Sequence, residues 1–466
     1  MVTHPLRISH VGLRGVVGSG LTATHAMDFA AAFGTFLPDP GPVLIGRDPR
    51  ASGEMLREGV IASLLACGRD VVDLGIVSTP VIQHAIARSA GRPNAAAGGI
   101  SISASHNTAE WNALRFFGPG GTYLSTAEAS ELLDIYHLRK FAFEPWDRIG
   151  RVSQQTDAID RYLDDLNIVF KFDSIRNIRV IVDCASGTSS VILKRLNERF
   201  GLRLLLINEH VEGMRFAHEP TTSKRVVALQ LAPLVKPVGA EAGFLFDLDA
   251  DRVAMATELG EAVSEEMMLA LLADDLLARG PGKLVITNLS TTALLDEIAA
   301  RHGGRVVRVP VGRQAATDAL ATYPPEEIAV AGEGSGAVMM PQFRFVYDGI
   351  AAMFAVLRIM RESERKLSEL VASYPRYEIC KGEVPLSSQR IPALFLELRN
   401  RYADGRQNTS DGLRVDWPDS EGKGARWFHV RVSQTEPVVR VYCEQCGETP
   451  SELFEELLEI VRQYAA

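Results

Sequence analysis

The sequence has few cysteines, no long apolar run and no excess of positive charge. Five cysteines among 466 residues are too few for a disulfide framework, which indicates a reducing compartment. No uninterrupted apolar stretch approaches the roughly 18 to 20 residues that span a bilayer, and the amino terminus lacks the apolar segment of a signal peptide. We therefore expect a cytoplasmic protein with no membrane partner.

The net charge of −9 argues against nucleic acid as a partner, so any bound anion must meet local cations. The hydrophobic content of 46% is that of a globular protein, and 466 residues suit three or four domains of about 100 to 150 residues each. The Cys443 and Cys446 pair lacks further ligands at zinc spacing and follows a strand-like run. We therefore do not expect a metal or redox site there.

Strand-like and helix-like segments alternate along the first three quarters of the chain, which predicts α/β layers. Strands are predicted over 43–45, 71–74, 95–102, 112–117, 179–183, 204–207, 243–246, 283–287, 305–309 and 328–331, with helices over 52–67, 126–139, 190–200, 226–234, 265–279 and 349–361. Residues 12–18 are predicted to form a glycine-rich loop, and 145–155 a linker. From about residue 374 a strand, a helix, three strands and a helix predict a separate α+β domain with an antiparallel sheet.

The turn Ser103–Asn107 follows a run of small and β-branched residues, typical of a buried strand that ends in an exposed turn. Ser105 is the candidate reactive residue there. A serine hydroxyl alone is a poor nucleophile, so its neighbours must activate or modify it. Either Ser105 or Asn107 caps a helix that begins near Thr108, or Ser105 carries a phosphoryl group.

Three carboxylates follow the apolar strand 243–246, at Asp247, Asp249 and Asp251. On a compact loop they can converge on one hard cation, and oxygen ligands at this density suit Mg²⁺. A Ca²⁺ loop would need a distal glutamate that is missing here, and a solvated acidic loop fits poorly after an apolar strand. The adjacent Arg252 holds a phosphate oxygen or balances the acids.

Two further loops carry polar groups suited to a sugar phosphate. In Gly332–Gly336, glycines alternate with Glu333 and Ser335, which lets the backbone approach a polyhydroxylated ligand. In 431–437, an arginine, two hydroxyls and free backbone amides make a plausible phosphate cradle. Each loop alone is also compatible with an ordinary turn.

Five stretches, taken in their order and separations, resemble the motifs of the α-D-phosphohexomutase family: Gly46–Asp48, Ser103–Asn107, Asp247–Arg252, Gly332–Gly336 and Arg431–Pro437. The family includes phosphoglucomutase, phosphomannomutase and phosphoglucosamine mutase, and the resemblance covers essentially the whole chain. It implies four domains around a central cleft, here 1–155, 156–257, 258–371 and 372–466. Three would be related α/β domains and the fourth α+β, each giving one loop to the site.

The resemblance also implies a reaction, a reversible phosphoryl transfer between positions 1 and 6 of a hexose phosphate. A phosphoserine at Ser105 would donate to the sugar, with a hexose 1,6-bisphosphate as intermediate and priming donor. One Mg²⁺ would be held by the serine phosphate together with Asp247, Asp249 and Asp251. The catalytic group would further comprise Arg14, His106, Arg115 and Arg252. Sugar hydroxyls would be bound by Glu333 and Ser335, and the phosphate that is not reacting by Arg431, Ser433, Gln434 and Thr435.

The chain departs from the family pattern at Arg115, usually lysine, and at Ala337, often histidine. The loop Gly332–Gly336, called the sugar loop below, and His218–Pro220 resemble the phosphoglucosamine mutase and archaeal-type branch of the family. Phosphomannomutase or phosphoglucomutase activity is the alternative, followed by a sugar-phosphate-binding protein without turnover. A serine hydrolase using Ser105 and His106 is disfavoured, because no nucleophile-elbow sequence surrounds the serine. As partners we expect hexose phosphates, in a monomer or a homodimer.

Overall fold

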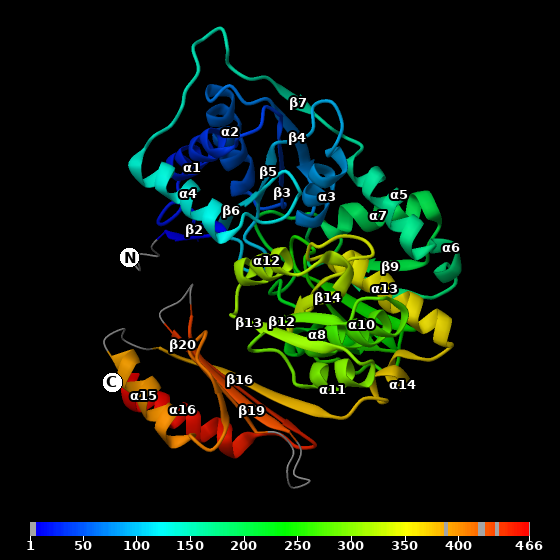
Figure 1. Ribbon diagram of the computed structural model, residues 1–466. Coiled ribbons are helices and arrows are strands. Elements are labelled where there is room, and N and C mark those ends of the chain that lie inside the picture. Colours follow the sequence, from blue (N-terminus) through cyan, green and yellow to red (C-terminus); the bar gives the residue numbers. More distant parts are fainter. Residues whose placement is uncertain (1–5, 386–389, 418–424, 434–437, 466) are drawn as a thin grey trace.

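The computed structural model describes residues 6–385, 390–417, 425–433 and 438–465. These residues form four β-sheets in succession along the chain, with helices packed on them (Figure 1). Three domains mix helices with mixed sheets, and the C-terminal domain has an all-antiparallel sheet. The fold class predicted from the sequence is confirmed. Within the described residues, no helix combines the length and apolar character needed to cross a membrane.

The first sheet has seven strands in the order β1-β2-β6-β5-β3-β4-β7. They span Arg7–Ser9 (β1), Gly12–Val16 (β2), Val43–Arg47 (β3), Val71–Ile76 (β4), Gly98–Ile102 (β5), Trp111–Phe117 (β6) and Val152–Gln154 (β7). One face packs on α1 (Ala23–Phe36), α2 (Ser52–Ala66) and α4 (Thr126–Leu138). The other packs on α3 (Thr79–Ser89). Strand β5 runs parallel to β3, so its carboxyl end delivers the Ser105 turn to one edge.

Two segments of this sheet differ from the sequence prediction. The glycine-rich loop predicted at 12–18 is wrong, because β2 pairs with β6 over most of it. A Cβ at Gly12 would lie 1.9 Å from the Leu114 carbonyl oxygen, so this glycine permits close strand approach. The linker predicted at 145–155 is wrong over its last part, since β7 adds to the sheet beside β4.

The second sheet has the order β11-β10-β8-β9, with β8 to β10 parallel and β11 antiparallel. The strands span Val180–Asp183 (β8), Leu204–Ile207 (β9), Ala242–Phe246 (β10) and Val253–Thr257 (β11). Helices α5 (Ala158–Phe170), α6 (Phe172–Ile175) and α7 (Ser189–Phe200) pack on one face. The helix predicted at 226–234 is wrong as a single element: α8 (Lys224–Gln230) and α9 (Ala232–Val235) are separate, and Pro233 in the first turn of α9 cannot continue a helical hydrogen-bond ladder.

The third sheet has the order β13-β12-β14-β15. Its strands span Leu284–Asn288 (β12), Arg305–Val309 (β13), Ile328–Glu333 (β14) and Ala337–Met339 (β15). Helices α10 (Glu265–Arg279), α11 (Leu294–Arg301) and α13 (Gly349–Ser363) cover one face, and α12 (Arg313–Thr322) the other. The short η1 (Pro325–Glu327) and α14 (Leu367–Val371) complete the domain. One apolar core runs through α3, α5, α10 and α13, so the first three domains pack as a continuous body.

The fourth sheet has the order β16-β20-β19-β18-β17. Its strands span Tyr377–Pro385 (β16), Arg406–Asn408 (β17), Leu413–Trp417 (β18), Arg426–Val432 (β19) and Val438–Cys446 (β20). Helices α15 (Ile391–Arg401) and α16 (Ser451–Ala465) cover one face around a separate core. Strand β19 alternates between that core, which takes Phe428 and Val430, and the opposite face, where His429 contacts Ser290 of the third domain.

Candidate active site

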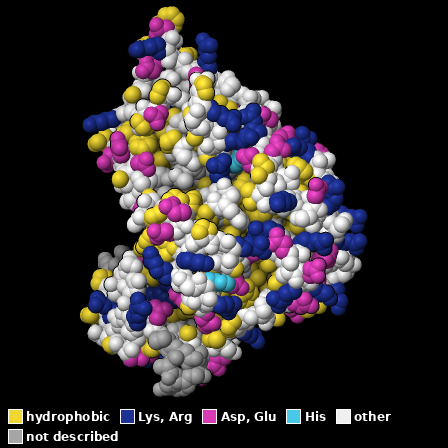
Figure 2. Space-filling view, turned by 45° about the vertical axis from the view of Figure 1, so that its right-hand side comes forward, with side chains coloured by type: hydrophobic (Ala, Val, Ile, Leu, Met, Phe, Trp, Pro, Cys, Tyr) yellow, Lys and Arg dark blue, Asp and Glu magenta, His cyan; other side chains and the backbone are white. Residues whose placement is uncertain are grey.

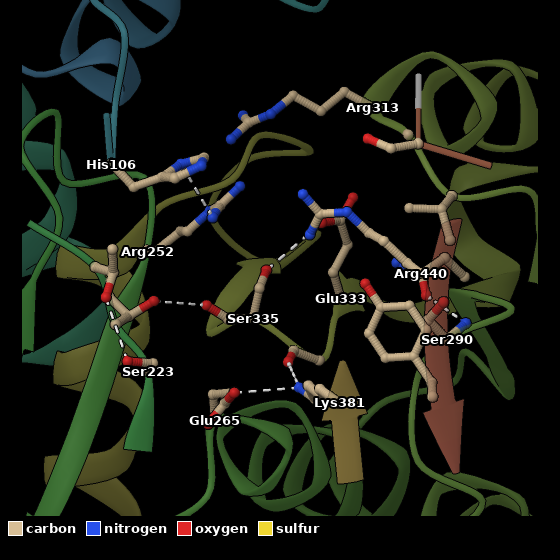
Figure 3. Close-up of a pocket in the computed structure, with 18 of the residues that line it drawn as sticks. His106, Ser223, Arg252, Glu265, Ser290, Arg313, Glu333, Ser335, Lys381 and Arg440 are labelled. Carbon is tan, nitrogen blue, oxygen red and sulfur yellow. Dashed lines mark hydrogen bonds and ion pairs between the residues drawn. The ribbon is translucent and has the colours of Figure 1, made fainter. Parts of the chain in front are cut away.

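A cleft of about 480 Å³ is lined by residues of all four domains (Figure 3). On the face shown in Figure 2 the outline of the molecule is hollowed between its upper and lower parts, and charges of both signs are mixed over the surface. The lining groups are mostly polar or charged, and include Arg14, His106, Arg115, Ser223, Arg252, Glu265, Arg313, Glu333, Ser335, Lys381, Arg431, Ser433 and Arg440. The four sheets therefore surround one polar site.

The first part of the Ser105 turn is buried, with Ser105 itself 0% exposed, whereas His106 and Asn107 are half-buried and His106 lines the cleft. The expectation of an exposed turn is wrong for its first residues up to Ser105, because the acidic loop of the second domain contacts Ser105. Ser105 Oγ donates a hydrogen bond of 2.6 Å to Asp247 Oδ2, and Ser105 adopts a left-handed conformation with φ +50°. The chain continues from this turn into β6 without a helix, so the capping interpretation is also wrong.

Two buried residues after β3 fix the serine turn. Arg50 donates to the carbonyl oxygens of Ser105 (2.9 Å) and Asn107 (2.6 Å). Its Nε donates to Asp48 Oδ2 at 3.0 Å, and the same carboxylate accepts from Ser103 Oγ at 2.6 Å. The aspartate of the Gly46–Asp48 motif thus orients the turn through Arg50 and Ser103.

Asp247, Asp249 and Asp251 are buried, and one ligand oxygen from each lies within 4.8 Å of the others. Oδ1 of Asp249 and Oδ1 of Asp251 are buried without a hydrogen-bond partner among the described residues. Leaving a buried acceptor unpaired costs about 1–3 kcal/mol, so these oxygens are suited to a ligand that completes them. An all-carboxylate cluster of this size fits Mg²⁺. Burial, with the charges of Asp251 and Asp249, raises the pKa of Asp247 well above its ordinary value.

Four arginines concentrate positive charge around the serine: Arg14, Arg115, Arg252 and Arg313. Burial, together with the nearby Arg115 and Arg313, lowers the pKa of Arg14 to about 9. Arg14 Nη1 also donates to Asn107 Oδ1 at 3.0 Å. Burial opposes the charge of Arg115 and Arg313 as well, but the paired acids outweigh it and raise the pKa of both groups. The charged form of Arg14 is disfavoured by its surroundings and would be stabilised by a bound anion.

His106 and Arg115, both counted among the catalytic candidates, meet different partners. His106 Nδ1 lies 3.4 Å from Ser105 Oγ and 3.4 Å from Arg252 Nη1. Burial and the Arg252 charge hold the pKa of His106 well below its ordinary value, so its ring is neutral. Arg115 is buried, and its Nη1 donates to Asp249 Oδ2 at 2.7 Å and to Asp251 Oδ2 at 3.1 Å.

The loop Gly332–Gly336 presents its polar groups to the cleft. Ser335 Oγ lies 3.5 Å from Glu333 Oε2, and the Tyr347 hydroxyl donates to Glu333 Oε1 at 3.2 Å. Lys381 Nζ donates to Gly334 O (3.2 Å), Glu266 Oε1 (2.9 Å) and Glu265 Oε1 (3.1 Å). This lysine joins the fourth domain to the loop.

The fourth domain brings Arg431 and Ser433 to the same cleft. Arg431 Nε donates to Asp411 Oδ2 at 2.8 Å, and that oxygen also accepts from the Val311 amide at 2.9 Å. The other two predicted phosphate ligands, Gln434 and Thr435, lie outside the described residues. Arg440, on the neighbouring strand β20, lines the cleft as well.

Sequence reasoning did not identify Arg313 and Lys381 as cleft residues. Arg313 follows the predicted strand 305–309 by a short turn, and its place beyond the carboxyl end of a parallel strand was a usable signal. Lys381 lies within β16, where neither spacing nor composition separates it from any solvated lysine of a strand. Arg440 could not be identified from the sequence for the same reason.

The arrangement suits phosphoryl transfer. Such transfer needs positioning and charge neutralisation more than covalent chemistry, and the cleft combines a hydroxyl, three carboxylates and several arginines. His106 and Asp247 are titratable groups that lie beside Ser105 Oγ.

Comparison with known proteins gives matches over nearly the whole chain. Family models described as phosphoglucomutase/phosphomannomutase, alpha/beta/alpha domains I, II and III, match residues 8–142, 160–260 and 264–377. A phosphoglucomutase/phosphomannomutase of Thermococcus kodakarensis is 31% identical and covers 96% of each chain. A probable phosphoglucosamine mutase of Pyrococcus abyssi is 32% identical over 97% of this chain and 96% of its own. The structure of a Burkholderia thailandensis phosphoglucomutase/phosphomannomutase family protein has a TM-score of 0.81 at 25% identity, covering 98% of this chain and 97% of its own.

Proposed function

The chain belongs to the phosphoglucomutase/phosphomannomutase family and is a phosphohexomutase, an isomerase of sugar phosphates, and we propose that it interconverts glucosamine 6-phosphate and glucosamine 1-phosphate. Phosphorylated Ser105 would donate its phosphoryl group to the free position of the sugar. The resulting bisphosphate would turn over in the cleft, and its other phosphate would return to Ser105.

The observation that carries this proposal is the hydrogen bond from Ser105 Oγ to Asp247 Oδ2. It places the candidate nucleophile directly on the acid cluster, although the two come from different domains. Asp247, Asp249 and Asp251 would hold one Mg²⁺, which would neutralise charge on the phosphoryl oxygens when bound. The three acids fit that role because two of their buried oxygens lack a hydrogen-bond partner among the described residues.

The remaining groups would bind and orient the sugar phosphate. Arg14 and Arg252 would face the transferring phosphoryl group, with the neutral His106 beside the serine oxygen. Glu333 and Ser335 would bind sugar hydroxyls. Arg431 and Ser433 would hold the phosphate that is not reacting, together with Gln434 and Thr435. We also propose that the domains 1–155, 156–257, 258–371 and 372–466 each supply one of these loops.

Glucosamine phosphate is favoured by the relatives, several of which are probable phosphoglucosamine mutases at 28–32% identity. The Thermococcus relative at 31% identity is a phosphoglucomutase/phosphomannomutase, so mannose and glucose phosphates form the second candidate. A binding protein without turnover is the third, and the intact serine and acids argue against it.

A coupled assay across glucosamine, mannose and glucose 6-phosphates tests the substrate. Each reaction would contain Mg²⁺ and a catalytic amount of the matching 1,6-bisphosphate as priming donor. We expect the highest kcat/KM with glucosamine 6-phosphate. A higher value with mannose or glucose phosphate would move the assignment to the second candidate, and no turnover of any sugar would favour the third.

A further inference from the structure

Arg313 is the cation through which the third domain reaches the acid loop of the second. It is the first residue of α12 and follows Gly312, whose φ of +142° favours glycine. One guanidinium nitrogen, Nη2, donates to Asp251 Oδ2 at 2.5 Å. The other, Nη1, donates to the Tyr123 hydroxyl of the first domain at 2.9 Å. A single side chain therefore contacts three domains at the site.

The surroundings of Arg313 restrict its movement. Its guanidinium carbon lies 5.5 Å from the ring centroid of Tyr123 and 4.8 Å from that of Tyr347, and both are cation–π contacts. The Tyr347 hydroxyl in turn donates to Glu333 of the sugar loop. Arg313 thus lies in a line of contacts that runs from Glu333 to Asp251.

The hydrogen bonds that Arg115 and Arg313 donate to Asp249 and Asp251 all end on the Oδ2 oxygens. Arg313 and Arg115 both donate to Oδ2 of Asp251, and Arg115 also donates to Oδ2 of Asp249. Thr79 Oγ1 adds a hydrogen bond of 2.8 Å to the same oxygen of Asp249. Oδ1 of each acid is buried and has no hydrogen-bond partner in the described part of the chain. Arg252 Nε lies 3.8 Å from Asp251 Oδ1, too far for a hydrogen bond. The donors on Oδ2 therefore fix the orientation of both carboxylates and leave each Oδ1 without a hydrogen bond.

We propose that Arg313 is a positioning residue for the metal site, which holds Asp251 through Oδ2 so that Oδ1 is kept for the cation. This inference rests on the proposed function, because it presumes that the acids bind a metal. Loss of an outer partner of a metal ligand typically weakens metal affinity about 10- to 100-fold. If Arg313 only balanced the charge of the acids, it would repel a divalent ion. Its removal would then strengthen metal binding.

Binding of Mn²⁺ to the full chain without sugar separates these alternatives, with free Mn²⁺ measured by its electron paramagnetic resonance signal. We expect Arg313→Met to weaken Mn²⁺ binding by at least about tenfold, and Arg313→Lys, which keeps the charge but loses the two-ended contact, to weaken it by less. Arg305→Met is the matched control, because Arg305 lies in the same domain, is exposed and stacks on Tyr323. The Mn²⁺ affinity of Arg305→Met should equal that of the wild type.

Unchanged or tighter Mn²⁺ binding in Arg313→Met would overturn the positioning role, and so would wild-type affinity in Arg313→Lys. If Arg313→Met does not fold, as judged by its thermal unfolding, Arg313→Lys decides the question alone. Failure of the wild type to bind Mn²⁺ would overturn the proposed metal site and this inference with it. Wild-type binding that is insensitive to both Arg313 variants would overturn the inference alone.

Discussion

Ser105 Oγ lies 2.6 Å from Asp247 Oδ2, although 142 residues separate the two in sequence. Each side chain stands just beyond the carboxyl end of a parallel strand, Ser105 after β5 and Asp247 after β10. The two sheet edges meet because α3 and α5 pack in one shared core. Domain packing therefore creates the contact between the candidate nucleophile and the acid cluster, which neither domain contains alone.

Removal of the metal should abolish turnover reversibly. Exhaustive treatment with EDTA is expected to stop the mutase reaction, and added Mg²⁺ to restore it, because the cation supplies several kcal/mol of charge stabilisation. Asp249→Asn should lower kcat by about a hundredfold or more, since one of the three carboxylates is lost. Full activity after chelation would mean that the acids are structural.

Arg431→Ala should raise KM alike for every hexose phosphate that is turned over. The phosphate is common to all of them, and a charge-assisted hydrogen bond contributes about 1.5–3 kcal/mol, which corresponds to roughly a ten- to hundredfold change. Arg426→Ala is the control, because Arg426 lies on the same strand and stacks on Trp417. A change in sugar preference at constant KM would instead show that this loop recognises hydroxyls.

Arg115→Lys should lower kcat at every pH. Arg115 is buried on two acids, and guanidinium carries its charge there without losing its proton. A lysine that acted as a base would become neutral as pH rises, so the variant would then gain rate at alkaline pH. The pH–rate profiles of wild type and variant on one substrate distinguish the two, and a several-fold faster variant above neutrality would contradict this account.

His429 should make stability fall in acid. Burial lowers its pKa from 6.5 to about 4, and Nε2 lies 2.6 Å from the Asp411 carbonyl oxygen while Nδ1 lies 2.8 Å from Ser290 Oγ. Between those two pKa values the unfolded chain binds a proton that the folded chain does not. Stability therefore rises with pH over this window and is lost as pH falls through it.

The expected contribution of His429 at pH 4.5 is about 2–3 kcal/mol. Urea unfolding at pH 7 and pH 4.5 measures it, and His429→Gln should show the smaller loss of stability between the two. Part of the loss should remain in the variant, because burial also lowers the pKa of His84 to about 4. An equal loss in both proteins would mean that His429 does not stay neutral in the fold.

The sequence was most informative where polar residues follow an apolar strand. The Ser105 turn, the acids and the Glu333 loop each follow the carboxyl end of a strand that pairs in parallel within its own sheet, which is where functional groups of α/β domains gather. The alternation of elements also predicted the α/β and α+β classes. Both signals depend only on the order of neighbouring residues along the chain, which can be read from the sequence.

Contacts between domains could not be predicted from these local signals. The burial of Ser105 depends on the acid loop of another domain, and Arg313 becomes part of the site only because α12 faces Tyr123. Gly12 is a second example. The sequence alone does not distinguish a glycine that allows close approach of two strands from a glycine that allows a turn. Such positions are decided by packing partners that are distant in sequence.

The central claim is that Ser105 carries the transferred phosphoryl group, and intact-mass spectrometry tests it most directly. After incubation with Mg²⁺ and glucosamine 1,6-bisphosphate, wild type should gain about 80 Da, the mass of one added phosphoryl group, while Ser105→Ala should gain nothing and have no mutase activity. The variant should still fold, as judged by its thermal unfolding, because the substitution removes only one hydroxyl. A Ser105→Ala protein that gains the same mass, or that turns over substrate at the wild-type rate, would contradict the account.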